Sequence, residues 1–351
     1  MSNLSLLALE HQRKRTELSG RVARRAARLW RSIQAGDIDA GWDRIAPELE
    51  RVVSAGQLQA ARMAPRYTSA VASAQSVSGS SGMVVPEAFT GATLEGRAVV
   101  PELFTAATVT KSLIGRGVGV GAAFRSGTAM MSILAATMVR DAGNMADKVS
   151  GLQRSRTVMY ARVVSPGACS RCAILAGVGH FTKHFERHPE CRCTTVPIYS
   201  DNPDAPLPDG LYGSPSDYFE SLSKAEQDRI FTKAGAEAIR LGADPVSVVN
   251  ARRGMYRVRQ PGSLVARAVP RTVIGPDGKP FLAYTTTEGT TVRGWFGGGY
   301  GGSRPGGQYV RSGTDRYRRT TAVRLMPETI ISQASAPEEA VEMLKRFGYI
   351  P

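Results

Sequence analysis

Histidine and cysteine are scarce in this chain of 351 residues, which has four of each. All four cysteines and three of the histidines lie in residues 169–193, which leaves a single histidine for the rest of the chain. Catalysis by a Ser/His/Asp or Cys/His set needs a histidine beside a nucleophile, and we find no convincing set of this kind. The H-E-x-x-H motif of zinc hydrolases is also missing. These absences argue against a hydrolase and favour a protein that is not an enzyme.

The chain also lacks long apolar runs and is poor in aromatic residues, at 7%. An apolar stretch such as Met130–Val139 has about half the length of a membrane span. At the N-terminus a short apolar run precedes the charged residues, the reverse of the order in a secretory signal. We therefore expect no membrane association and a cytoplasm-like compartment. Cysteines there bind metals or act in catalysis more often than they form disulfides.

Positive charge is abundant, with a formal net charge of +15. Residues 251–351 hold 16 basic and 7 acidic residues, a surplus of nine positive charges. A field of this sign favours contact with polyanions, so we expect nonspecific DNA binding. The segment from Gln12 to Ile33 places Leu18, Val22 and Ala26 on one helical face and arginines on the opposite face. Those arginines are read either as DNA contacts or as an ordinary solvated surface.

The first 150 residues are predicted to be helical. Further helices are expected over residues 37–56, over 57–76 with an interruption at Pro65, over 101–114 and over 122–148. Asp37 or Asp39 would cap the second helix. The glycine-rich segment 115–128 lacks the Lys-Ser/Thr ending of a phosphate-binding loop, so it is interpreted as a helix junction.

The pattern changes to the strand period at Val158–Val164 and again at Cys191–Ser200, which predicts two paired strands. Short helices follow over 214–254, with Ser223 and Glu226 as a capping box. Later, "GPDG" predicts a hairpin turn, "WFGGGYGGSRPGGQYVRSGTDRYRR" a flexible tract, and residues 337–347 a helix.

The fold class is therefore mainly α with a small α+β central domain and a flexible basic C-terminal tail. Three regions are predicted: a helical N-terminal region over 1–150, a Cys/His-containing α+β domain over 151–255, and a Gly/Arg-rich tail with a short C-terminal helix over 256–351.

The cysteines have the spacing of a zinc site. Cys169 and Cys172 form a C-x2-C pair, and Cys191 and Cys193 form a C-x-C pair after 18 intervening residues. Zinc binds four soft ligands tetrahedrally, and two close cysteine pairs supply that number. Alternate residues of a strand point to opposite faces, so the C-x-C pair needs a bulge or turn to reach one ion. His188 is then an alternative fourth ligand to Cys193.

Three interpretations of this window stay open. The first is a structural zinc ion held by three or four cysteines, with or without His188. The second is a metal-free cluster of thiols that joins the hairpin. The third is a catalytic thiol or a metalloenzyme site. His180, His184 and His188 recur every four residues and would share a face if this segment were helical.

At these residues the sequence resembles a known family. "VVSPGACSRCAILAG" followed by "FERHPECRC" is similar to the central domain of MuF-like head-morphogenesis proteins, the minor capsid proteins of tailed phages. The segment "FESLSKAEQDRIFTKAGAEAIRLGADPVSVVNARRG" resembles the actinobacteriophage branch, as does the ending "RLMPETI…EEAVEMLKRFGYI". The paired cysteines and the HP-x-C-x-C motif of the family map onto Cys169, Cys172, His188, Cys191 and Cys193.

The resemblance implies a virion protein that acts in capsid assembly, in the head interior or at the portal, after synthesis in the host cytoplasm. Its partners would be the portal protein and the major capsid protein. The alternative function is a capsid maturation protease that cleaves capsid or scaffold proteins, a label that this branch often carries.

Overall fold

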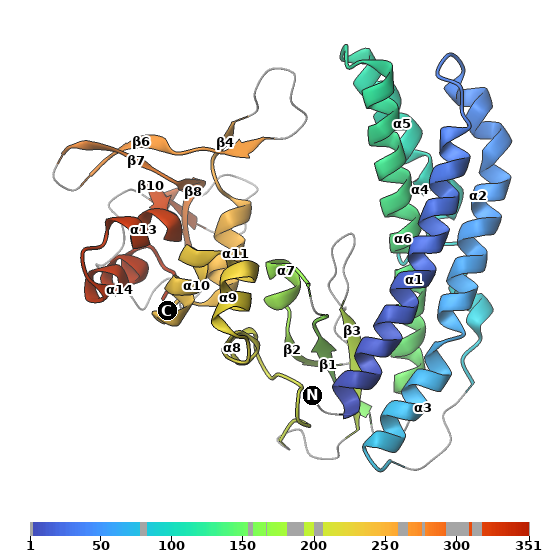
Figure 1. The fold of residues 1–351 in the computed structure, drawn as a ribbon, viewed down its shortest axis with the longest axis horizontal. Coiled ribbons are helices and arrows are strands. Elements are labelled where there is room, and N and C mark those ends of the chain that lie inside the picture. Colours follow the sequence, from blue (N-terminus) through green and yellow to red (C-terminus); the bar gives the residue numbers. More distant parts are fainter. Residues whose placement is uncertain are drawn as a thin grey trace. The chain divides into compact units, whose positions relative to one another are not determined.

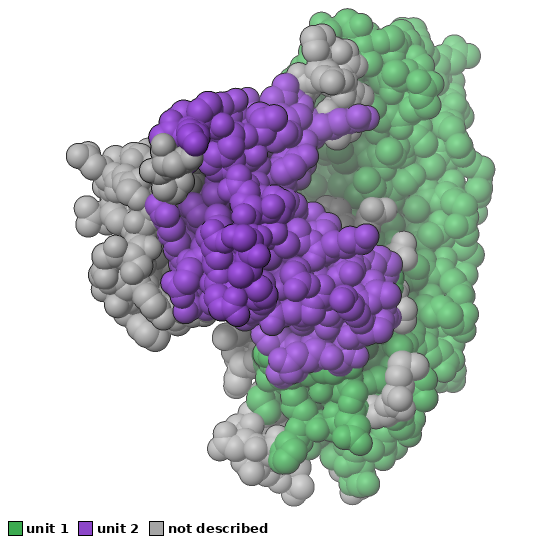
Figure 2. All heavy atoms as spheres, turned by 60° about the vertical axis from the view of Figure 1, so that its left-hand side comes forward, with its two compact units in different colours: residues 1–168, 175–214 green, residues 169–174, 215–351 purple. Residues whose placement is uncertain are grey.

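The computed structural model divides the chain into two compact units, which are coloured in Figure 2. Unit 1 contains Met1–Ala168 and Leu175–Ser214, and unit 2 contains Cys169–Ile174 and Pro215–Pro351. The structure describes residues 3–77, 83–153, 157–165, 167–180, 193–199, 206–258, 266–275, 278–292, 309–310 and 318–350.

Unit 1 is built on long helices that lie side by side (Figure 1). Its helical elements are α1 (Asn3–Arg31), α2 (Ile38–Ala61), α3 (Ala64–Ala74), the 3-10 helix η1 (Pro86–Phe89), α4 (Val99–Leu103), α5 (Thr105–Gly115) and α6 (Val120–Leu152). Helix α6 packs against α1, α2, α3 and α5 and is therefore the centre of the unit. Trp30, Leu49 and Met131 are fully buried among these helices.

Local sequence signals explain where several of these helices begin. The Asp37 carboxylate accepts a hydrogen bond from the backbone N–H of Ala40, as predicted for the cap of α2. The interruption expected at Pro65 is a boundary between two helices. Pro65 lies in the first turn of α3, where its missing N–H and fixed φ cost little.

Two glycines allow the helices to approach closely. A Cβ on Gly127 of α6 would come within 2.7 Å of Cζ2 of Trp30. A Cβ on Gly56 of α2 would lie 2.7 Å from Cγ2 of Val22 and 2.9 Å from Cγ2 of Val139. The absence of side chains at these positions sets the distances between α1, α2 and α6.

Helix α6 is long and apolar enough, by length and composition alone, to cross a membrane. Within its most apolar window 39% of the residues are buried inside the protein. A central helix of a folded helical unit passes the same test of length and composition.

A three-stranded sheet completes unit 1, with strands β1 (Thr157–Val163), β2 (Gly177–His180) and β3 (Thr194–Tyr199) in the order β2-β1-β3. Strands β1 and β3 pair antiparallel, as the alternating patterns predicted, with Ala161 opposite Val196. Every residue of β3 is buried. Strand β2 was not predicted, because two of its four residues are glycines and it has no alternating pattern.

Helix α3 lies along the outer edge of β3. The Tyr67 hydroxyl donates a hydrogen bond to the Thr195 carbonyl at 2.7 Å. The Gln75 amide donates to the Pro197 carbonyl at 2.8 Å and accepts from the Tyr199 N–H at 3.1 Å. Side chains of α3 and of Gln75, the residue that follows it, therefore bond to alternate residues of the strand.

Unit 2 is a second mixture of helices and short strands. Its helices are α7 (Ser170–Ala173), α8 (Pro215–Glu220), α9 (Lys224–Phe231), α10 (Lys233–Arg240), α11 (Pro245–Arg253), α13 (Pro327–Gln333) and α14 (Pro337–Arg346). Its strands are β4 (Arg257–Val258), β5 (Arg267–Ala268), β6 (Arg271–Ile274), β7 (Pro280–Ala283), β8 (Thr285–Val292), β9 (Tyr309–Val310) and β10 (Arg318–Leu325). Strands β6 and β7 form the hairpin that the "GPDG" sequence predicts.

The C-terminal residues are part of the core of unit 2. Tyr349 is fully buried, its hydroxyl donates to the Leu325 carbonyl at 2.9 Å, and its carbonyl accepts from the Asp244 N–H at 2.8 Å. The guanidinium carbon of Arg324 lies 3.9 Å from the centre of the Tyr349 ring. Burial raises the pKa of Tyr349 to about 12.

The predicted fold class, mainly α with a small α+β part, is confirmed. The capping box is present, since the Ser223 hydroxyl accepts from the Glu226 N–H and the Glu226 carboxylate accepts from the Ser223 N–H. Most of the Gly/Arg/Tyr tract at 295–319 lies outside the described residues. The structure divides the chain into two compact units, and the division into three regions stays a prediction.

Candidate functional site

The structure describes three of the five predicted zinc ligands. Cys169 is exposed at the N-terminal end of α7, Cys172 is buried within α7, and Cys193 is buried next to the start of β3. Cys169 and Cys172 belong to unit 2 and Cys193 belongs to unit 1. Cys191 and His188 lie outside the described residues, as does His184. The zinc site therefore stays a prediction.

His180 is the last residue of strand β2. The shared helical face considered for His180, His184 and His188 thus does not include His180. The backbone there pairs with β1, with His180 opposite Met159.

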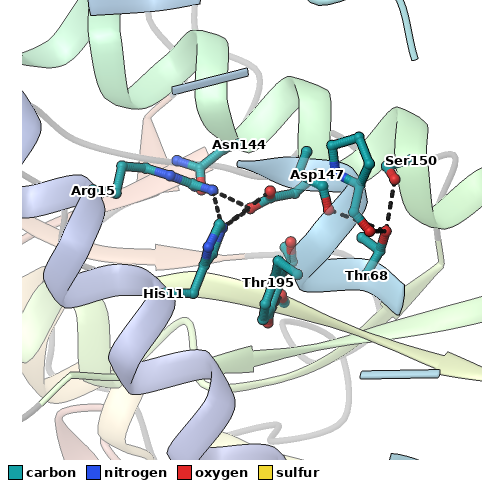
Figure 3. Close-up of polar contacts among 10 residues, drawn as sticks. His11, Arg15, Thr68, Asn144, Asp147, Ser150 and Thr195 are labelled. Carbon is teal, nitrogen blue, oxygen red and sulfur yellow. Dashed lines mark hydrogen bonds and ion pairs between the residues drawn. The ribbon is translucent and has the colours of Figure 1, made fainter. Parts of the chain in front are cut away.

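Unit 1 contains a group of buried polar and charged side chains that the sequence pattern did not indicate. His11 and Arg15 of α1 meet Asn144 and Asp147 of α6, as Figure 3 shows. His11 Nε2 lies 3.1 Å from both carboxylate oxygens of Asp147. Arg15 donates to Asp147 and Asn144 and also contacts His11 Nε2. We call these four residues the buried charge cluster.

Tyr67 of α3 closes the cluster from a third helix. Its ring stacks on that of His11, with ring centres 3.9 Å apart and planes 2° from parallel. Through its hydroxyl, Tyr67 also connects the cluster to strand β3. The cluster therefore joins α1, α3 and α6 and reaches the sheet.

Further polar contacts lie along the same helices. The hydroxyls of Thr68 and Ser150 share a hydrogen bond at 2.6 Å (Figure 3), and Arg140 Nε donates to the Ser19 hydroxyl at 3.0 Å. Gly143 leaves the space that Arg15 occupies, because a Cβ there would lie 2.8 Å from Arg15 Nε. The seam between α1 and α6 is thus built around buried arginines.

Burial and charge set the protonation states in the cluster. Burial lowers the pKa of His11 below its ordinary 6.5, and the negative charge of Asp147 offsets this only in part. Burial alone would raise the pKa of Asp147, but the charge of Arg15, followed by the interactions with His11, outweighs burial and lowers it. The cluster therefore contains a carboxylate, a guanidinium and a neutral imidazole near pH 7.

A histidine beside an aspartate is also found in catalytic sites, but this pair is closed to substrates. The side chains of Arg15 and Asp147 are completely buried, and that of His11 is 7% exposed. A general base must come within hydrogen-bond reach of the proton it removes. The arrangement serves instead to hold three helices in register.

One signal in the sequence could have identified half of this cluster. His11 and Arg15 precede Leu18 and Val22 at spacings of four, three and four residues, so all four share the core face of α1. The predicted core face began at Leu18. Nothing in the local sequence indicates that Asp147, 132 residues after Arg15, is the partner.

Comparison with known proteins gives one family. The model of the VG15 protein family matches residues 7–218, which is more than half of the chain and spans α1 to α8. No curated protein and no solved structure matches the chain. The chain belongs to the VG15 protein family, a family of viral proteins from phages.

Proposed function

We propose that this protein is a structural minor capsid protein that acts in phage head morphogenesis. The observation that carries the proposal is the family match over residues 7–218. The match covers all but the first six residues of unit 1, whose buried charge cluster holds helices together. The similarity of the Cys/His window to MuF-like proteins supports a place in the head interior or at the portal, with portal protein and major capsid protein as partners.

Mass spectrometry of purified particles tests this proposal. We expect the protein in proheads and in DNA-filled heads at a low and constant copy number relative to the portal protein. Particles from a phage with a stop codon early in this gene provide the control for contamination. Absence of the protein from both kinds of particle would refute a structural role in the virion.

The alternative, a capsid maturation protease, gains no support from His11, because its contact with Asp147 is buried. A protease of this kind predicts that capsid subunits in the virion lack residues encoded at the start of their gene. Capsid subunits that keep their encoded N-terminus would contradict this alternative, because the capsid protein in the shell would then be uncleaved at that end.

We also propose that the Cys/His window binds a structural zinc ion. The spacing of the two close cysteine pairs, Cys169 with Cys172 and Cys191 with Cys193, supports this, since the pairs supply the four soft ligands that zinc binds. Metal analysis should find about one zinc per chain, and Cys172→Ser should lower both the zinc content and the melting temperature. A zinc-free protein whose stability a chelator leaves unchanged would favour the cluster of thiols without metal.

A further inference from the structure

The exposed side of α1 carries a row of arginines. Arg21, Arg24, Arg28 and Arg31 are all exposed and follow one another at three, four and three residues. Residues at these spacings lie on one side of a helix, and ten residues of helix extend over about 15 Å. The buried Val22, Ala26 and Trp30 lie on the opposite side. We call the four residues the arginine row.

Other charged residues of α1 form ion pairs with nearby carboxylates, and the arginine row differs from them. Near the start of the helix, Lys14 pairs with Glu10 and Arg13 with Glu17, each within 2.7 Å. Within the described part of the chain, no carboxylate forms an ion pair with any of the four arginines of the row. Among the described residues, the arginine row therefore carries positive charge that no ion pair offsets.

The helix dipole explains only part of the arginine row. Cations in the last turn of a helix are stabilised by the helix dipole, and Arg28 and Arg31 lie there. The effect falls off within one turn, so it does not explain Arg21 and Arg24.

A groove between α1 and α2 extends the positive surface on one side. It has a volume of about 210 Å³, and arginines from both helices, Arg21, Arg25 and Arg51, lie around it. Its apolar lining includes Leu18 and Val22, which are buried. One carboxylate, that of Glu48, is shared by Arg25 and Arg51, each at 2.7 Å. Three guanidinium groups and one carboxylate leave a net positive rim.

Guanidinium groups bind phosphate through paired N–H donors, and they need no particular base to do so. Double-stranded DNA carries one negative charge per about 1.7 Å of its axis, so a row about 15 Å long meets several phosphates on any sequence.

We propose that the arginine row and the neighbouring groove bind the phosphate backbone of double-stranded DNA. The choice of DNA as the polyanion rests on the proposed function, which places the protein in a particle that is filled with DNA. The surface itself follows from the exposed arginines of the row, which form no ion pair with the part of the chain that the structure describes.

The test measures binding of the full chain to two labelled 30-base-pair duplexes of unrelated sequence over a range of salt concentrations. The variant R21Q/R24Q/R28Q/R31Q removes the row. The control variant R13Q/R62Q/R97Q/K111Q loses the same charge from exposed residues of unit 1, all of which form ion pairs. Melting temperatures and circular dichroism establish that both variants are folded.

We expect the wild-type chain to bind both duplexes equally. The row variant should bind about tenfold or more weaker at low salt, and the slope of log affinity against log salt should fall by roughly three to four. The control should keep most of the wild-type slope. An equal loss in the two variants would overturn the proposal, because net charge alone would then explain binding. An unchanged slope in the row variant would overturn it as well.

The double variant R21Q/R24Q keeps the proposal testable if the quadruple variant does not fold, and it avoids the last turn of α1. Its slope should fall by roughly two.

This test is separate from the analysis of particles. DNA binding through the row with no protein in the virion would refute the proposed function alone, whereas protein in the virion with no contribution from the row would refute this inference alone.

Discussion

Arg15 lies in the interior of unit 1, where its guanidinium forms an ion pair with the carboxylate of Asp147. Both side chains are completely buried, so the charge of one would not be hydrated if the other were removed. A buried pair of charges adds little net stability compared with well-packed apolar residues, but the loss of one partner is costly. The cluster therefore constrains which helices pack together more than it strengthens their packing.

Replacing Asp147 with asparagine should destabilise unit 1 strongly. The substitution leaves Arg15 buried without a counter-ion, and we expect the free energy of unfolding to fall by about 3–5 kcal/mol. Denaturant unfolding followed by circular dichroism measures the change. Glu17→Gln, which breaks the exposed pair with Arg13 in the same helix bundle, is the control and should change stability little. Equal effects of the two substitutions would show that burial of the cluster is unimportant.

Mild acid should destabilise the protein through His11. The pKa of this buried imidazole is below the ordinary 6.5, so the unfolded chain takes up a proton at a higher pH than the folded chain does. The stability due to the neutral imidazole is therefore complete above about pH 6.5 and is lost as the pH falls toward the lowered pKa. The charged or titratable groups around the ring are Asp147, Arg15, Lys14 and Tyr67.

Melting temperatures at pH 7.5 and 5.5 test this expectation. Acidification should lower the melting temperature of His11→Gln by roughly several degrees less than that of the wild-type chain. The amide of glutamine keeps a donor for Asp147 but does not titrate. Because the other three histidines remain in both proteins, the difference isolates His11, and equal drops would contradict the prediction.

At the scale of the elements, the close approach of helices in unit 1 depends on where α6 lacks a side chain. Gly127 faces Thr110 of α5 and Trp30 of α1, both of which are buried. A larger residue would force the indole or a helix to move, and overpacking of this kind costs about 1–3 kcal/mol.

Gly127→Ala should therefore lower the free energy of unfolding by about 1–3 kcal/mol, although alanine is the better helix former. Gly121, in the first turn of the same helix, has only the end of the Arg125 side chain within 4 Å of a built Cβ, at 3.6 Å. Gly121→Ala should be neutral or stabilising by up to about 1 kcal/mol. Thermal and denaturant unfolding of the two variants measure the contrast. A stable Gly127→Ala protein would show that the contact relaxes without cost.

The elements also show what local sequence can and cannot predict. The caps at Asp37 and Ser223 and the hairpin before Pro280 were predictable, since each depends on residues within a few positions. Strand β2 was not, because its glycines give no period. The partners of Arg15 and Tyr67 lie more than 120 residues away, at Asp147 and Thr195, so no local rule identifies them.

At the scale of the whole molecule, each of the two compact units has a core of its own. In unit 1 the core surrounds Trp30 and Leu49, and in unit 2 it contains Phe231, Ile330 and Tyr349. Units with separate cores are able to unfold separately.

Calorimetry of the full chain should therefore resolve two transitions. Asp147→Asn should lower one of them, and Tyr349→Ala, which empties a fully buried site in unit 2, should lower the other by roughly 10 °C. Each substitution should leave the second transition near its wild-type temperature. A single transition that moves with both substitutions would show that the units unfold together.

The contacts of α3 with β3 have a consequence for the sheet as a whole. The outer strand of a sheet normally presents unpaired backbone groups on which another strand can assemble. Here Tyr67 and Gln75 already bond to Thr195, Pro197 and Tyr199, and Pro197 has no N–H to offer. A helix thus occupies the place of a fourth strand, and this edge is closed to sheet growth. A strand from another molecule therefore cannot pair with the backbone of β3 along this edge.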